Sequence, residues 1–187
     1  MDFNQKLQNA IKKNNSLLCV GLDPDLANIE GSIDIFHFNK KVIDDTAGLV
    51  CAYKPNSAFY DAYGLDGPKF LKLTIDYIQD NYPDIPVILD AKRADIGSTS
   101  EMYARQVFDF LQADAVTLNP YLGEDALAPF LLRKDKGIIV LCRTSNPSAA
   151  DFQDADVRGM PLYLKVAQKA VEWDKKYQNV LLVVGAA

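Results

Sequence analysis

Residues 87–108 read VILDAKRADIGSTSEMYARQVF, an apolar run that changes first into a charged segment and then into a helical pattern. The first three residues are typical of a buried strand. Asp90, Lys92, Arg93 and Asp95 follow at the point where such a strand should leave the core. The stretch therefore predicts a strand, a charged turn and a helix, in that order. Its charges could form either a solvated strand end or a reaction centre.

The same alternation of apolar and amphipathic segments runs through the whole chain. Short runs that are apolar on both faces predict strands of a buried parallel sheet, and they occupy residues 17–22, 48–53, 86–89, 115–118, 137–142 and 180–184. Amphipathic segments with helical spacing lie between them, at residues 2–14, 34–46, 67–80, 98–112, 124–134 and 157–176. The tetrapeptide Ser98-Thr99-Ser100-Glu101 matches a capping box, which predicts a helix start just after the charged turn.

Strict alternation of strands and helices predicts an α/β domain with right-handed crossovers. Six strands alone do not separate an open, doubly wound sheet from a (βα)8 TIM barrel. The last residues, VLLVVGAA, form a strand of the buried type without a helix after it, which favours a barrel that continues further. We therefore expect residues 1–187 to form a single barrel domain, with about six of its βα units present and the C-terminal part missing.

Composition narrows the class of protein. The net charge of −5 argues against nucleic acid as the main partner, because phosphate binding needs a basic surface. The three cysteines lie far apart in apolar runs and have no metal-ligand spacing, as expected in a reducing compartment. The N-terminus lacks the apolar region of a signal peptide, and no apolar run is long enough to span a bilayer. We expect a cytoplasmic protein without membrane or nucleic-acid partners.

Polar side chains collect at the C-terminal ends of the predicted strands, which is where α/β proteins place their sites. In chain order, the strand ends contribute Asp23, then Lys54, then Asp90 with Lys92 and Asp95, then Asn119, and finally Arg143 with Ser145. These residues are remote in sequence, yet parallel strands would bring them to one rim. We therefore treat this rim as the candidate site.

The charges of the third strand suggest a type of chemistry. Asp90 and Lys92 are two residues apart and should share a strand face, whereas Asp95 lies past the strand. Opposite charges ~4 Å apart attract by about 4 kcal/mol at an effective dielectric constant near 20. Alternating lysines and aspartates would hold an ammonium ready to donate a proton, and the carboxylate would repel an anionic group of a substrate. This favours decarboxylation, although an ordinary salt-bridge cluster remains the alternative.

The motif DAKRADIGST resembles the Asp-x-Lys-x-x-Asp-Ile-x-x-Thr signature of the orotidine 5′-phosphate decarboxylase family. The segments LCVGLDPD, CAYKPNSAFYDAYG and RTSNPSAADFQ are similar to the longer bacterial branch of that family, and the similarity covers essentially the whole chain. The resemblance implies a (βα)8-barrel homodimer that needs no cofactor. Such an enzyme converts orotidine monophosphate to uridine monophosphate and carbon dioxide, the last step of de novo UMP synthesis.

The resemblance also implies roles for the charged residues. Lys92 would donate the proton to C6 of the pyrimidine, and Asp90 would face the departing carboxylate. Lys54 would bridge the ribose and the charged array. Asp95, with Ile96 and Thr99, would reach into the active site of the partner subunit, so that each site is shared.

Three further positions are expected to bind substrate. By the resemblance, Asp23 would bind a ribose hydroxyl and Ser145 the pyrimidine edge. Asn119 closes the fourth strand and could face the substrate. Arg143 is compatible with either a phosphate contact or a salt bridge within its loop, and the single histidine, His37, is expected to be structural.

The family pattern is not matched everywhere. In the family, the phosphate is held by backbone amides and an arginine after the seventh and eighth strands, and these positions have no counterpart among residues 1–187. Metal-dependent relatives, the 3-keto-gulonate 6-phosphate decarboxylases and hexulose phosphate synthases, share the Asp-x-Lys-x-x-Asp motif. They place an acidic metal ligand at the end of strand two, where this chain has Lys54. We therefore expect no metal, and we keep these relatives and a non-catalytic nucleotide-binding fragment as the alternatives.

Overall fold

The structure is a computed structural model that describes residues 1–29 and 33–185. The described strands are β1 (Cys19–Leu22), β2 (Ala52–Pro55), β3 (Ile88–Arg93), β4 (Ala115–Leu118), β5 (Gly137–Arg143) and β6 (Val180–Val184). Every pairing between them is parallel: β1 pairs with β2, and β3 to β6 pair in sequence order. Two isolated parallel bridges, Tyr53 with Val87 and Asn56 with Asp90, connect β2 to β3.

The strand order therefore follows the sequence from β1 to β6, as in the wall of a (βα)8 barrel. A doubly wound sheet would reverse its order at a switch point, so the structure decides between the two α/β architectures. Within the described residues the wall is open, because β1 and β6 each have a paired neighbour on one side only. These two strands are consequently less buried than β4, in which all four residues are buried.

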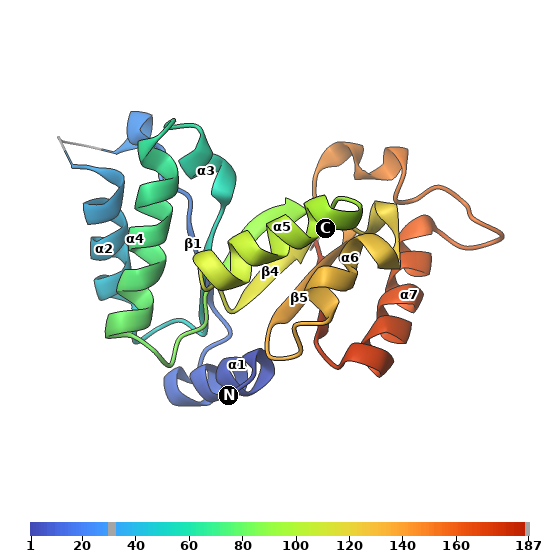
Figure 1. Cartoon of the computed structure of the whole chain (residues 1–187), viewed down its shortest axis with the longest axis horizontal. Helices are drawn as coiled ribbons and strands as arrows, with labels where there is room; N and C mark the ends of the chain where they lie inside the picture. The colour runs from blue at the N-terminus through green and yellow to red at the C-terminus, as the bar shows by residue number, and fades with distance from the viewer. Residues whose placement is uncertain (30–32, 186–187) are drawn as a thin grey trace.

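The helices are α1 (Phe3–Asn14), α2 (Ile35–Thr46), α3 (Ser57–Asp61), α4 (Asp66–Asn81), α5 (Gly97–Arg105), α6 (Glu124–Leu131) and α7 (Leu162–Tyr177). Figure 1 shows α2 and α4 side by side at one end of the molecule, α5 and α6 in front of β4 and β5, and α7 at the other end. The main core lies between these helices and the outer face of the strands. None of the described helices has the length and apolar character needed to cross a membrane.

Helix α1 covers the N-terminal ends of the strands and fills the bottom of the barrel (Figure 1). An Asp2 capping box starts this helix, and Asn15 in the left-handed conformation ends it. Phe3 is 3% exposed and packs in a second core cluster with Ile88. A methyl group added at Gly137 would lie 2.3 Å from the Phe3 ring. Gly137 thus provides the space for the Phe3 ring beneath the strands.

Every predicted strand and helix has a counterpart in the structure, although most boundaries differ by a few residues and α7 begins at Leu162, five residues later than predicted. The bounds of β4 and β6 are those predicted, but β2 and β3 both begin and end later than predicted, so that Lys54 and Lys92 lie within strands. A helix starts just after the charged turn, as predicted, but without the capping box: α5 already begins at Gly97, its N-cap residue Ile96 makes no side-chain cap, and Ser98 lies inside the helix. The short helix α3 was not expected, because it occupies a single turn between two stronger patterns.

The single histidine, His37, takes part in the N-terminal cap of α2. His37 lies exposed in the first turn of α2, where its backbone N–H donates to the N-cap residue Asp34 at 2.9 Å. Its ring Nδ1 lies 2.8 Å from the same carboxylate. These contacts start the helix.

Candidate active site

One buried carboxylate connects two lysines at the C-terminal ends of β2 and β3. Asp90 Oδ2 lies 2.9 Å from Lys54 Nζ, and Asp90 Oδ1 lies 2.7 Å from Lys92 Nζ. The side chain of Asp90 is 10% exposed, whereas that of Lys92 is 48% exposed. The structure thus brings together three of the residues that the sequence placed in the site, with an ammonium group reaching out to solvent.

Lys92 reaches Asp90 through an irregular backbone. Its φ is +47°, in the left-handed region that non-glycine residues avoid, and the pairing of β3 with β4 shifts register between Leu89 and Arg93. Asp90 and Lys92 meet as expected, but across an irregular, bulged backbone and not through the simple alternation of a regular strand. Such a conformation costs on the order of 1–3 kcal/mol and is concentrated at functional sites.

Thr117 on β4, which was not among the predicted site residues, holds the bulge in place. Its hydroxyl donates to Asp90 Oδ1 at 2.8 Å and accepts from the backbone N–H of Lys92 at 3.0 Å. The side chain is buried, at 3% exposure. The sequence feature that could have indicated Thr117 is its hydroxyl group within an otherwise apolar strand, Ala115–Leu118. That signal alone does not separate a site residue from an ordinary strand threonine.

The surroundings of Asp90 keep it ionised. Burial raises the pKa of this carboxyl, but hydrogen bonds from Lys92, Lys54 and Thr117 outweigh the burial and hold the pKa below its ordinary value. A carboxylate shared by two ammonium groups and a hydroxyl is negatively charged at neutral pH. Chemically, the cluster can repel an anionic substituent and deliver a proton from Lys92.

Asp23 immediately follows β1 and lies beside the same strand ends. Its Oδ1 accepts a hydrogen bond from the backbone N–H of Asn56 at 3.0 Å. A methyl group added at Gly21 would lie 3.7 Å from Asp23 Oδ2, so the carboxylate lies above that glycine. Gly21 is the register partner of Lys54. Asp23 therefore belongs to the layer of the barrel that carries the charged cluster.

Asp95, Ile96 and Thr99 do not join the cluster within one chain. Asp95 Oδ1 accepts from the backbone N–H of Ile96 at 2.7 Å, which shapes the turn before α5. Ile96 is 63% exposed, and Thr99 is exposed in the first turn of α5. Among residues 1–29 and 33–185, no lysine or arginine forms an ion pair with Asp95.

The other predicted positions lie around the rim. Asn119 is exposed and caps the 3-10 turn Pro120–Leu122, because its Oδ1 accepts from Tyr121 N–H at 3.1 Å. Ser145 lies close to the end of β6, since a methyl group added at Gly185 would be 2.8 Å from the Ser145 nitrogen. Within the described residues, neither side chain forms a hydrogen bond with Asp90, Lys54 or Lys92.

Arg143 forms the loop salt bridge that was one of its two possible roles. Its guanidinium lies 2.9 Å (Nε) and 3.0 Å (Nη2) from the carboxylate of Asp154, and Nη1 donates to the Thr144 carbonyl at 2.6 Å. In the part of the chain that the structure describes, no three His, Cys, Asp or Glu side chains are grouped as metal ligands would be.

Parallel strands in sequence order, with a charged cluster at their C-terminal ends, define an α/β-barrel protein with a site at the usual rim. Residues 16–186 match the model of the orotidine 5'-phosphate decarboxylase / HUMPS family. The chain belongs to this family.

Individual relatives agree with the family assignment. The orotidine 5'-phosphate decarboxylase of Cellvibrio japonicus is 52% identical, over 100% of this chain and 70% of that protein. The enzyme of the same name from Thermomicrobium roseum is 51% identical, over 100% of this chain and 68% of that protein. The solved OMP decarboxylase of Leishmania donovani superposes with a TM-score of 0.90 at 38% identity, covering all of this chain and 71% of that one. The fold is therefore that of the TIM-barrel decarboxylases.

Proposed function

We propose that this chain decarboxylates orotidine 5′-monophosphate to uridine 5′-monophosphate and CO2, the last step of de novo pyrimidine biosynthesis, without a cofactor. The observation that carries the proposal is the ionised, buried Asp90 held between Lys54 and Lys92. The relatives at about half identity, which bear the name of this activity, support it further.

In the proposed reaction, Asp90 faces the carboxylate of the substrate. Repulsion between the two anions raises the energy of the bound substrate and is relieved when CO2 leaves. The bond between C6 and the carboxylate breaks, and its electron pair stays on C6. The Lys92 ammonium then gives a proton to C6. Its partial exposure leaves Nζ accessible to a ligand at the rim.

Lys54 and the rim residues would hold the rest of the nucleotide. Lys54 is proposed to bridge the ribose and the charged cluster, and Asp23 to accept a ribose hydroxyl. Asp23 Oδ1 already accepts a backbone N–H, which leaves Oδ2 for the sugar. Ser145 is proposed to bind the pyrimidine edge, and Asn119 to face the substrate.

We also propose a homodimer with shared sites, in which Asp95, Ile96 and Thr99 act in the site of the partner subunit. The exposure of Ile96 and Thr99 in a single chain supports this arrangement. Apolar surface near the same rim supports it as well: Tyr121 and Phe152 are 87% and 76% exposed and line one cavity of about 590 Å³. Exposed aromatic patches of this kind are typical of protein interfaces.

We also propose a domain organisation and a cellular compartment for the protein. Residues 1–187 would belong to a single barrel domain, because the main core includes residues from α2 through α7. The protein would act in the cytoplasm, to which three unpaired cysteines are suited.

The deciding experiment follows the fall in absorbance of orotidine monophosphate with the wild-type chain and with Lys92→Ala. We expect Lys92→Ala to lose the rate by several orders of magnitude. Lys41→Ala is the matched control, because Lys41 is exposed and its one ion pair among the described residues is with Asp45. Retained activity in Lys92→Ala would overturn the assignment of the proton donor.

The same assay separates the alternatives. Activity that disappears with EDTA would indicate a metal-dependent member of the family, whereas we expect EDTA to have no effect. Binding of uridine monophosphate without turnover by the wild-type chain would indicate a non-catalytic nucleotide-binding protein.

A further inference from the structure

Three polar side chains lie in the core between α2, α3 and α4, outside the charged cluster. Asn39, Tyr60 and Thr74 each have no exposed surface. Asn39 Nδ2 donates to the Tyr60 hydroxyl at 2.9 Å and to Thr74 Oγ1 at 3.2 Å. The network thus connects three helices through one amide group.

The network ends on the backbone next to the site. The Tyr60 hydroxyl donates to the carbonyl oxygen of Leu22 at 3.0 Å. Leu22 is the last residue of β1, and Asp23 follows it directly. Asn56, whose N–H donates to Asp23, is also the N-cap residue of the helix that carries Tyr60. Helix α3 therefore fixes both the backbone before Asp23 and its carboxylate.

Burial of this network is not explained by stability. Buried polar groups cost free energy unless every partner is present, and well-packed apolar side chains would stabilise the same volume at least as well. Asn39 Oδ1 is buried and has no hydrogen-bond partner among the described residues. An incompletely paired network that ends at a strand terminus beside a site suggests a role in positioning that terminus.

We propose that Tyr60, oriented by Asn39, is a positioning residue for Asp23. It does not touch the substrate. It holds the Leu22 carbonyl, and through it the end of β1, so that the Asp23 carboxylate meets a ribose hydroxyl. This inference rests on the proposed function, because the ribose contact is part of that proposal.

The test compares two buried tyrosines whose hydroxyl groups donate to different backbone carbonyls. Tyr60→Phe removes the hydroxyl that holds Leu22. Tyr53→Phe is the matched control: Tyr53 is equally buried, and its hydroxyl donates to the carbonyl of Ile43 at 2.9 Å, in the last turns of α2. Both variants lose one buried hydroxyl, so a purely structural role predicts similar losses of melting temperature and no difference in ligand binding.

The binding readout uses uridine 5′-monophosphate and its 2′,3′-dideoxy analogue, measured by titration calorimetry. We expect Tyr60→Phe to weaken uridine monophosphate binding about 5- to 10-fold and to leave binding of the analogue nearly unchanged. Tyr53→Phe should change neither affinity. The proposal is overturned if the ratio of the two affinities in Tyr60→Phe equals that of the wild type.

A ligand-free measurement keeps this test separate from the proposed function. The amide proton of Asn56 donates to Asp23, and its exchange with solvent should become about tenfold faster in Tyr60→Phe but not in Tyr53→Phe. If the wild type binds no uridine monophosphate, the proposed function fails while this exchange still decides the positioning role. Should Tyr60→Phe fail to fold, Thr74→Val, which removes one acceptor of Asn39, is expected to accelerate the exchange two- to threefold. Unchanged exchange would contradict the proposal.

Discussion

The hydroxyl of Thr117 donates a hydrogen bond to Asp90 Oδ1 at 2.8 Å, from one barrel strand to the next. The same hydroxyl accepts the N–H of Lys92, whose backbone is in the left-handed region. The Thr117 side chain therefore stabilises both the ionised Asp90 and the left-handed backbone of Lys92, the proposed proton donor.

Thr117→Val should lower kcat about tenfold, equivalent to about 1.4 kcal/mol of activation free energy. The carboxyl of Asp90 would lose one of the three hydrogen bonds that lower its pKa, so its pKa should rise. Because the proposed mechanism needs an ionised Asp90, the acidic limb of the pH–rate profile should move to higher pH. Thr117→Ser, which keeps the hydroxyl, should restore the wild-type profile. An unmoved acidic limb in Thr117→Val would show that this bond does not tune Asp90.

Mixing two inactive variants tests the shared site. Asp95→Asn and Lys92→Ala should each be inactive alone, because each damages both sites of a homodimer. In a mixed dimer, one site would receive Lys92 from one chain and Asp95 from the other, so activity should return to about a quarter of the wild-type level in an equal mixture. Subunit exchange is verified by native mass spectrometry. Exchange without recovery would mean that each chain completes its own site.

Gly137→Ala should destabilise the protein by about 1–3 kcal/mol, because the new methyl group would overlap the buried Phe3 ring. Urea unfolding gives the free energy. Phe3→Leu in the same chain should recover part of the loss, since the smaller side chain makes room for the methyl group. Gly48→Ala is the control: no atom lies within 4 Å of its added methyl group, so its effect should stay within about 0.5 kcal/mol. Additive losses in the double variant would contradict the steric explanation.

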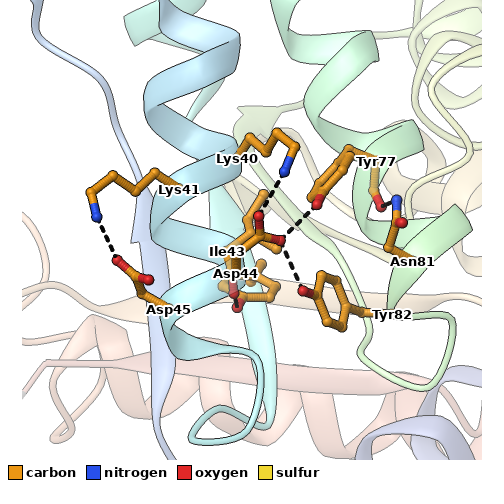
Figure 2. Close-up of polar contacts among 9 residues, drawn as sticks. Lys40, Lys41, Ile43, Asp44, Asp45, Tyr77, Asn81 and Tyr82 are labelled. Atoms are coloured by element: carbon orange, nitrogen blue, oxygen red, sulfur yellow. Dashed lines mark hydrogen bonds and ion pairs between the residues drawn. The ribbon is translucent and has the colours of Figure 1, made fainter.

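Asp44 connects α2 to α4, as Figure 2 shows. Its carboxylate accepts from Lys40 Nζ at 2.7 Å, from the Tyr77 hydroxyl at 2.6 Å and from the Tyr82 hydroxyl at 2.8 Å. The bonds from Lys40, Tyr77 and Tyr82 lower the pKa of Asp44 to about 2, and the carboxylate raises the pKa of Tyr82 to about 12. The carboxylate thus stabilises the fold only while it is ionised.

Asp44→Asn should therefore lower the free energy of unfolding at pH 6 by about 1 kcal/mol, a modest value because the site is partly exposed. A lowered pKa in the folded state contributes stability above the ordinary carboxyl pKa, and this contribution is lost as the pH falls towards 2. The difference between wild type and variant should accordingly shrink between pH 4 and 2. Asp45→Asn, which breaks only an exposed pair with Lys41, should have no measurable effect. A difference that is constant with pH would rule out the ionised carboxylate as its source.

The sequence predicted the alternation of elements because each strand and helix carries its own local period. The bounds of β4 and β6 were predicted to the residue. The ends of β2 and β3 were not, since Lys54 and Arg93 belong to strands only through their pairing with Gly21 and Leu118. Local patterns cannot contain that information.

The sequence by itself determined the α/β class, the strands that carry the site and the meeting of Lys54, Asp90 and Lys92, because parallel strands bring their C-terminal ends to one rim. Only the tertiary structure decided the sequential strand order, the bulge at Lys92 and the part played by Thr117. The strand order, the bulge and the contacts of Thr117 all depend on the pairing of neighbouring strands. The hydrogen bonds that define that neighbourhood join residues more than twenty positions apart in the chain.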